Sequence, residues 1–132
     1  MTEILQTTME IKSWDEQPYR ELDDGRKLTK ADVVLAGSDG QLESGTFESL
    51  MYYAADGTTT YVTVMHLTAT LNGRAGSVVL VGEGTFDGTT ARGTSRVVDG
   101  TGELAGISGE LTSESTHADY PNMPITLSYD LE

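Results

Sequence analysis

Six pairs of an aspartate or asparagine followed by glycine divide this chain into short segments, and they restrict its fold more than any other feature. The pairs are Asp24-Gly25, Asp39-Gly40, Asp56-Gly57, Asn72-Gly73, Asp87-Gly88 and Asp99-Gly100. Such pairs adopt the left-handed backbone angles that tight β-hairpins require. Between them, apolar and polar residues alternate with hardly any helical pattern. The sequence therefore predicts an all-β fold of consecutive antiparallel hairpins.

The alternating segments define eight expected strands in one domain, residues 1–132. They are Glu3–Trp14, Leu28–Ala36, Gln41–Ala54, Thr59–Leu71, Ala75–Phe86, Thr90–Val98, Ile107–His117 and Pro124–Leu131. An open sheet of eight long strands would expose two long edges, so the pattern favours closure into an antiparallel up-and-down β-barrel. An eight-stranded barrel has room for one small ligand inside.

The strand rhythm pauses only at residues 100–109, where four of ten residues are glycine. Thr101 could cap a short helical turn over Gly102–Ala105, and Gly106 and Gly109 could take positive φ angles that lead into the next strand. Such a turn could brace one end of the barrel. A glycine-rich surface loop is the alternative.

Several segments are apolar on both faces of their expected strands, notably 33–36, 50–54 and 78–81. Inside a barrel, these residues contact packed side chains or a ligand. Outside, a chain of 132 residues has no helical layer to cover them. We therefore expect a homo-oligomer, with a second copy covering part of the outer face.

Charge and composition bear on the partners. Twenty-one acidic and eight basic residues give a formal net charge of −13, which repels nucleic acid and anionic membrane surfaces. No apolar run is long enough to span a bilayer, and the first residues lack the pattern of a signal peptide, so the expected location is cytoplasmic. Without cysteine, thiolate chemistry is excluded. His66 and His117 lack metal-ligand spacing, so neither a metal nor a cofactor is expected.

The first segment carries the most suggestive polar residues. Strict alternation places Glu10, Lys12 and Trp14 on one strand face, and Met9 and Ile11 on the other. If the first face points inward, an acid and a base share a water-poor cavity, where burial shifts both pKa values toward a range useful for catalysis. If it points outward, they form an ordinary exposed pair. The alternation alone leaves both orientations open.

Aromatic and methionine side chains are candidates for contacting a ligand in the barrel. The candidates for substrate binding are Trp14, Met51, Tyr53, Tyr61, Met65 and Tyr129. These residue types suit a ligand cavity and suit a packed core equally well.

Segments over nearly the whole chain also carry a resemblance. They are Lys12–Glu16 with Pro18-Tyr19, Gly73–Ser77, Gly84–Gly88, Gly100–Gly106 and Tyr129–Glu132. Together they resemble a bacterial domain-of-unknown-function family whose members are similar to the barrel of plant allene oxide cyclase. Glu10 then resembles that enzyme's catalytic glutamate, and Lys12 stands where the cyclase has an asparagine that holds a water. The resemblance thus favours the inward orientation of Glu10 and Lys12.

Three functions follow from this interpretation. The first is a cofactor-independent cyclase or isomerase that folds an apolar, unsaturated polyketide-like or oxylipin-like molecule for ring closure, cycloaddition or rearrangement, with Glu10 and Lys12 as catalytic residues. The second is a barrel that binds or carries a lipophilic small molecule unchanged. The third is a barrel filled by its own side chains that serves in oligomerisation.

Overall fold

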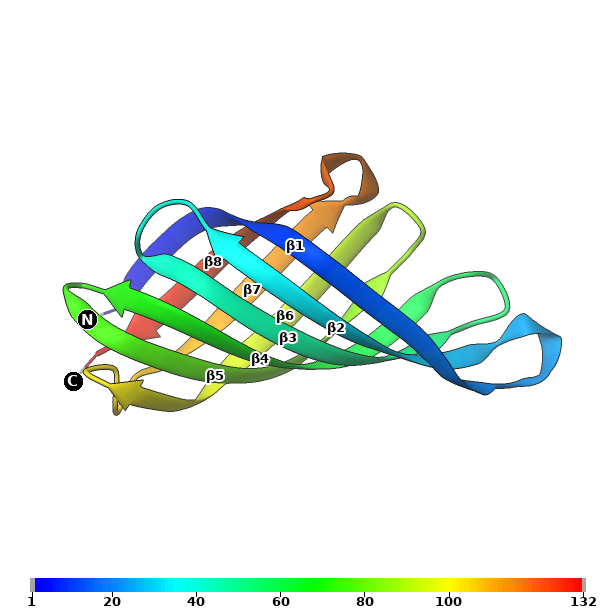
Figure 1. Ribbon diagram of the computed structural model, residues 1–132, viewed down its shortest axis with the longest axis horizontal. Helices are drawn as coiled ribbons and strands as arrows, with labels where there is room; N and C mark the ends of the chain where they lie inside the picture. Colours follow the sequence, from blue (N-terminus) through cyan, green and yellow to red (C-terminus); the bar gives the residue numbers. More distant parts are fainter. Residues whose placement is uncertain (1, 132) are drawn as a thin grey trace.

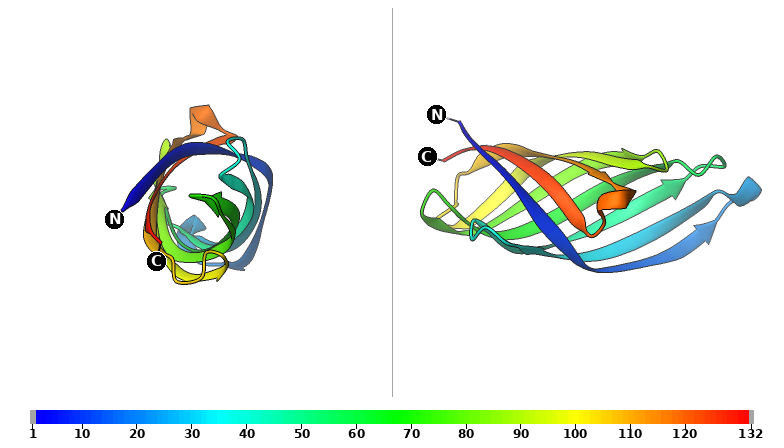
Figure 2. Two further views of the ribbon diagram at one scale, coloured as in Figure 1. Left: turned by 90° about the vertical axis from the view of Figure 1, so that its left-hand side faces the viewer. Right: turned by 90° about the horizontal axis from the view of Figure 1, so that it is seen from above.

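The computed structural model describes residues 2–131, and β-strands make up most of it (Figure 1). The eight strands are β1 (Glu3–Glu21), β2 (Lys27–Gly37), β3 (Leu42–Tyr53), β4 (Thr59–Leu71), β5 (Arg74–Phe86), β6 (Thr90–Gly102), β7 (Ser108–Thr116) and β8 (Asn122–Asp130). Each strand pairs antiparallel with the next, and β1 also pairs with β8, so the sheet closes into a barrel (Figure 2). The prediction of eight antiparallel strands in up-and-down order is confirmed.

Two single turns of 3-10 helix, η1 (Asp23–Gly25) and η2 (His117–Asp119), interrupt the strands. They lie at one end of the closed sheet, together with the β3–β4 and β5–β6 hairpins, and we call this the open end. The chain termini and the remaining connections lie at the other, closed end (Figure 1). Within residues 2–131, no helix has the length and apolar character needed to cross a membrane.

Five of the six Asx-Gly pairs connect consecutive strands, as predicted, and their glycines have φ angles between 78° and 98°. Asp99-Gly100 is the exception, because it lies inside β6 rather than in a turn. The β5–β6 register shifts beside it, with Val79 opposite Asp99 and Leu80 opposite Val97. An Asx-Gly pair thus accompanies a bulge here, which the dipeptide pattern cannot distinguish from a hairpin.

The glycine-rich segment after β6 braces the closed end. Leu104 is fully buried there, and the carbonyls of Thr101 and Leu104 accept backbone bonds of 3.1 Å from Leu104 and Ile107. A Cβ on Gly100 would lie 2.2 Å from the Leu104 carbonyl oxygen, so only glycine fits beneath this turn. The predicted helical cap is wrong, because the Thr101 hydroxyl bonds Ser77 instead.

The inner face of the closed sheet holds the core. Buried and less buried residues alternate along most strands of the closed-end half, and large aliphatic side chains fill the interior there. Fully buried members include Met9, Leu42, Leu67, Leu80 and Leu127. The packing is therefore dense at the closed end, and the outer face keeps polar residues with some exposed apolar ones.

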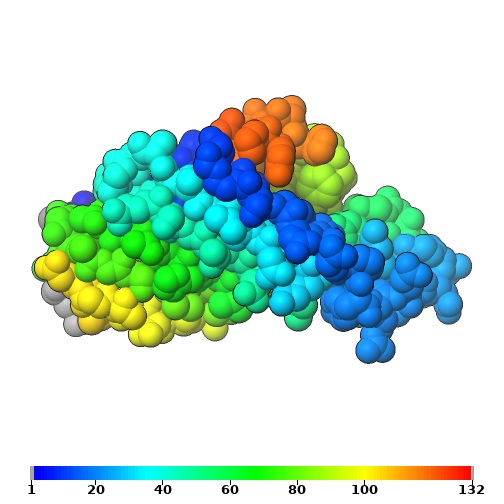
Figure 3. Space-filling view, viewed as in Figure 1, coloured from blue at the N-terminus to red at the C-terminus, as the bar shows by residue number. Residues whose placement is uncertain are grey.

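β1 is longer than predicted and continues for seven residues past Trp14, to Glu21. Only Glu3–Glu10 pair with β8, whereas pairing with β2 extends to the end of the strand. β1 tolerates Pro18 because this part of the strand pairs with β2 alone and not with β8, and because Pro18 lies beside a register shift. The β1–β2 hairpin consequently projects past the rest of the closed sheet (Figure 3).

Candidate functional site

A cavity of about 640 Å³ opens at the open end of the sheet. Its lining is mainly apolar and aromatic, and it includes Trp14, Phe47, Met51, Tyr53, Tyr61, Phe86, Tyr120 and Met123. A few polar groups converge on it, among them Glu16, Ser49, His117 and Asn122. A concave apolar pocket with few polar groups is the usual form of a small-molecule site.

A bulge in β1 decides which side chains enter this cavity. Ile11 opposes Leu35 and Ser13 opposes Val34, so Lys12 is an extra residue in the register. One extra residue reverses the inside-outside alternation that follows. Trp14 and Glu16 therefore join Ile11 on the inner face and line the cavity.

Glu10 and Lys12 lie on the outer face, and the expectation that they share the cavity is wrong. Both side chains are about half exposed, at 49% and 56%, and Lys12 Nζ lies 2.8 Å from Glu10 Oε1. Before the bulge, side chains alternate between the two faces of β1, and Met9 points inward, so its neighbour Glu10 points outward. Lys12 is the bulged residue itself. They form the ordinary exposed pair that was the alternative, worth little to stability.

Glu16 is instead the carboxylate inside the cavity. Its Oε2 accepts hydrogen bonds from the Tyr53 hydroxyl and, at 2.8 Å, from Thr29 Oγ1. Its Oε1 accepts a 3.0 Å bond from Trp14 Nε1. The donors come from β1, β2 and β3, so the closed sheet itself aligns them. The Trp14 ring also packs edge-on against Phe47, with centroids 6.0 Å apart.

These contacts shift two pKa values in opposite directions. Burial raises the pKa of Glu16, but the bonds from Tyr53, Thr29 and Trp14, with the charge of Lys27, outweigh it and leave the pKa below its ordinary value. Burial and the bond to the Glu16 carboxylate raise the pKa of Tyr53 to about 12. At neutral pH, Glu16 is therefore ionised and Tyr53 is protonated.

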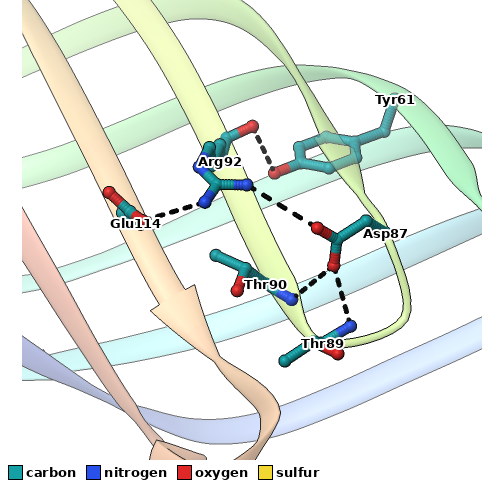
Figure 4. A network of polar contacts seen from close by, with 6 residues as sticks. All are labelled: Tyr61, Asp87, Thr89, Thr90, Arg92 and Glu114. Carbon is teal, nitrogen blue, oxygen red and sulfur yellow. Dashed lines mark hydrogen bonds and ion pairs between the residues drawn. The ribbon is translucent and has the colours of Figure 1, made fainter.

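Tyr61 forms a second part of the cavity wall, and polar contacts hold the hairpin beside it (Figure 4). Arg92 lies between Asp87 and Glu114, with N–O distances of 3.7 and 3.2 Å, and its carbonyl faces the Tyr61 hydroxyl at 3.5 Å. A Cβ on Gly84 would lie 2.4 Å from the Tyr61 hydroxyl oxygen, so this glycine makes room for the ring. Burial raises the pKa of Tyr61.

The other predicted ligand residues divide between the cavity and the core. Trp14, Met51, Tyr53 and Tyr61 line the cavity as expected. Met65 and Tyr129 are buried in the core and do not belong to the lining. Of the histidines, His66 is exposed on the outer face of β4, whereas His117 lies at the cavity mouth.

Residues 2–131 contain no group of three or more histidine or carboxylate side chains placed to hold a metal ion. Among residues 2–131, one buried side-chain group has no hydrogen-bond partner, the Thr59 hydroxyl. It lies at the start of β4, among the residues of the cavity wall.

Sequence reasoning missed Glu16, although the sequence holds a signal for it. Apolar residues occur at positions 9 and 11 and then at 14 rather than 13. This delay of one residue marks the bulge at Lys12, after which positions 14 and 16 share the inner face. Strict alternation over the whole segment concealed it.

Residues 5–129 match a protein family described as "Protein of unknown function (DUF3224)". A solved structure from the same family, a protein with unknown function from Shewanella oneidensis MR-1, is similar over 98% of each chain. The two share 26% sequence identity, with a TM-score of 0.74. No curated protein matches the chain.

Proposed function

The chain belongs to the DUF3224 family, whose description assigns no activity, so we propose its function from the cavity: it binds a mainly apolar small molecule at the open end of the closed sheet. The observation that carries the proposal is an apolar, aromatic-lined cavity of about 640 Å³ with one hydrogen-bonded carboxylate. This volume lies in the range of pockets that enclose a small ligand, about 300–1,000 Å³.

The resemblance to allene oxide cyclase supports a second candidate, a cofactor-independent cyclase or isomerase acting on an apolar, unsaturated substrate. The observation that favours it is a carboxylate held beside aromatic rings, where it could stabilise positive charge in a rearrangement. In this proposal, Glu16 takes the role expected of Glu10, because Glu16 lines the cavity and Glu10 does not.

Binding without turnover is the better supported of the two. A general acid or base works best with a pKa near the operating pH, and the pKa values of Glu16 and Tyr53 both lie far from neutrality. The site thus suits a fixed negative charge more than proton transfer. A cyclase would instead lose product formation in Glu16→Gln while retaining affinity for its substrate.

Titration with Nile red, a neutral dye that brightens in apolar surroundings, tests the binding proposal. Ala91 lines the cavity on β6, so Ala91→Trp should fill part of the space and weaken dye binding by about tenfold or more, which corresponds to about 1.4 kcal/mol or more. Thr68→Trp adds the same ring on the outer face of β4 and should bind like the wild type. Equal dye binding by both variants, or none by the wild type, would contradict the proposal.

A further inference from the structure

The Glu16 carboxylate has hydrogen-bonding capacity that the protein does not use. A carboxylate offers about four lone-pair sites, and Trp14, Thr29 and Tyr53 occupy three of them. Two of the three bonds go to Oε2 and one goes to Oε1. The remaining acceptor site is therefore on Oε1, the oxygen shared with Trp14.

No lysine or arginine among the described residues that line the cavity balances the charge of the Glu16 carboxylate. Glu16 is also the only carboxylate among these described lining residues. The charge of Lys27 acts on Glu16, but its Nζ lies over the Tyr53 ring, 4.9 Å from the centroid. Lys27 lies outside the lining set, and its position shows that an ammonium group is accommodated next to this pair.

Aromatic rings make up much of the lining of the cavity that contains Glu16. They are Trp14, Phe47, Tyr53, Tyr61, Phe86 and Tyr120. The faces of such rings carry negative electrostatic potential and attract organic cations, most strongly where water is excluded. An aromatic lining of this kind suits an organic cation better than an anion.

The whole molecule favours the same sign of ligand charge. The formal net charge is −13, and aspartates outnumber the basic residues of the four connections at the open end: Asp23, Asp24, Asp56, Asp87 and Asp119 against Arg26, with Arg92 beside Asp87. A negative field at the mouth of a cavity concentrates cations and repels anions.

From this arrangement we propose that the ligand is an organic cation: an apolar body, aromatic or aliphatic, that carries a protonated amine. The amine donates a hydrogen bond to Glu16 Oε1, and the body fills the aromatic-lined cavity. This inference rests on the proposed binding function and adds the chemical class of the ligand.

Two probes that share one body test the charge preference by calorimetric titration. They are 2-naphthylmethylamine, a cation at neutral pH, and 2-naphthalenemethanol, its neutral counterpart. The wild type should bind the amine about tenfold tighter or more, because a charge-assisted hydrogen bond and cation–π contact exceed a neutral hydrogen bond. Raising the salt concentration should weaken amine binding more than alcohol binding.

Glu16→Gln should remove the preference for the amine and leave alcohol binding nearly unchanged. Glu10→Gln is the matched control, since it deletes one carboxylate from the same strand but on the outer face, and it should retain the preference. If the wild type binds both probes equally, the cation proposal is overturned while the apolar cavity stands. If it binds neither probe nor Nile red, the proposed binding function falls with it.

Discussion

At the scale of single residues, Glu16 connects three strands through its carboxylate. Its donors are Trp14 on β1, Thr29 on β2 and Tyr53 on β3. Each donor bonds the charged form of the acid, which explains why the pKa falls despite burial. The ionisation of Glu16 is therefore coupled to the folding of this part of the sheet.

This coupling predicts a dependence of stability on pH. Because folding lowers the pKa of Glu16 below its ordinary value of 4.5, its contribution is present above that value and is lost as the pH falls through the folded pKa. Glu16→Gln should cost about 1 kcal/mol at neutral pH, allowing for solvent screening of the half-exposed carboxylate. The gap in unfolding free energy between the wild type and the variant should narrow from pH 7 to pH 3.

Urea titrations of the two proteins at several pH values measure this gap. Other carboxylates with lowered pKa values, such as Asp39 and Asp87, are present in both proteins and cancel in the difference. A gap that stays constant down to pH 3 would show that Glu16 is not held in its charged form by folding.

At the scale of elements, the turn after β6 closes one end of the sheet with a buried side chain. Leu104 is fully buried at its centre, although the turn consists mostly of small and polar residues. The side chain fills space that the strands alone leave at this end. A glycine-rich stretch can thus contribute a core residue while remaining close to the surface.

Leu104→Ala should accordingly destabilise the protein by about 2–5 kcal/mol, the usual cost of a cavity left by a buried leucine. Ser108→Ala, a neighbouring exposed position, should change stability by less than about 0.5 kcal/mol. Chemical unfolding measures both. Because Leu104 lies at the opposite end from the cavity, folded Leu104→Ala should bind Nile red like the wild type. If Leu104→Ala costs as little stability as Ser108→Ala, the turn does not have this role.

The number and order of strands could be predicted because their signals are local. Five Asx-Gly turns and the alternation between them each act within a few residues. Strict alternation could not predict which of Glu10 and Glu16 faces inward, because one bulged residue, Lys12, reverses the facing of the side chains from Ser13 to the next register shift beyond Pro18. The end of β1 was missed for a related reason: a polar segment with Pro18 looks like a loop until its partner β2 is known.

At the scale of the whole molecule, the outer face of β3, β4 and β5 carries adjacent exposed apolar residues. Leu50 opposes Val62, and Val64 opposes Val81 on the next strand. Leu50, Val62 and Val64 are each 50–55% exposed. Such a continuous strip is larger than the single apolar residues common on protein surfaces, and a second copy of the chain is the cover that we expect for it.

The expected homo-oligomer is tested by light scattering at micromolar concentration. The wild type should give at least twice the chain mass of 14.2 kDa. Val64→Glu should reduce the mass to that of one chain, because it places a charge in the centre of the strip, while Thr68→Glu on the same outer face but beyond the strip should not. A wild-type mass near that of a single chain would contradict the expected homo-oligomer.

The closed sheet separates its packed half from its hollow half, and this has an evolutionary consequence. Leu42, Leu67 and Leu104 are fully buried at the packed end, so replacements of partly exposed residues around the cavity, such as Ala91, can change its shape at little cost to the core. A one-residue insertion or deletion near Lys12 would exchange the row of β1 side chains that lines the cavity. The lining of the cavity can therefore differ between proteins that share this fold, and a shared fold is a weak guide to a shared function.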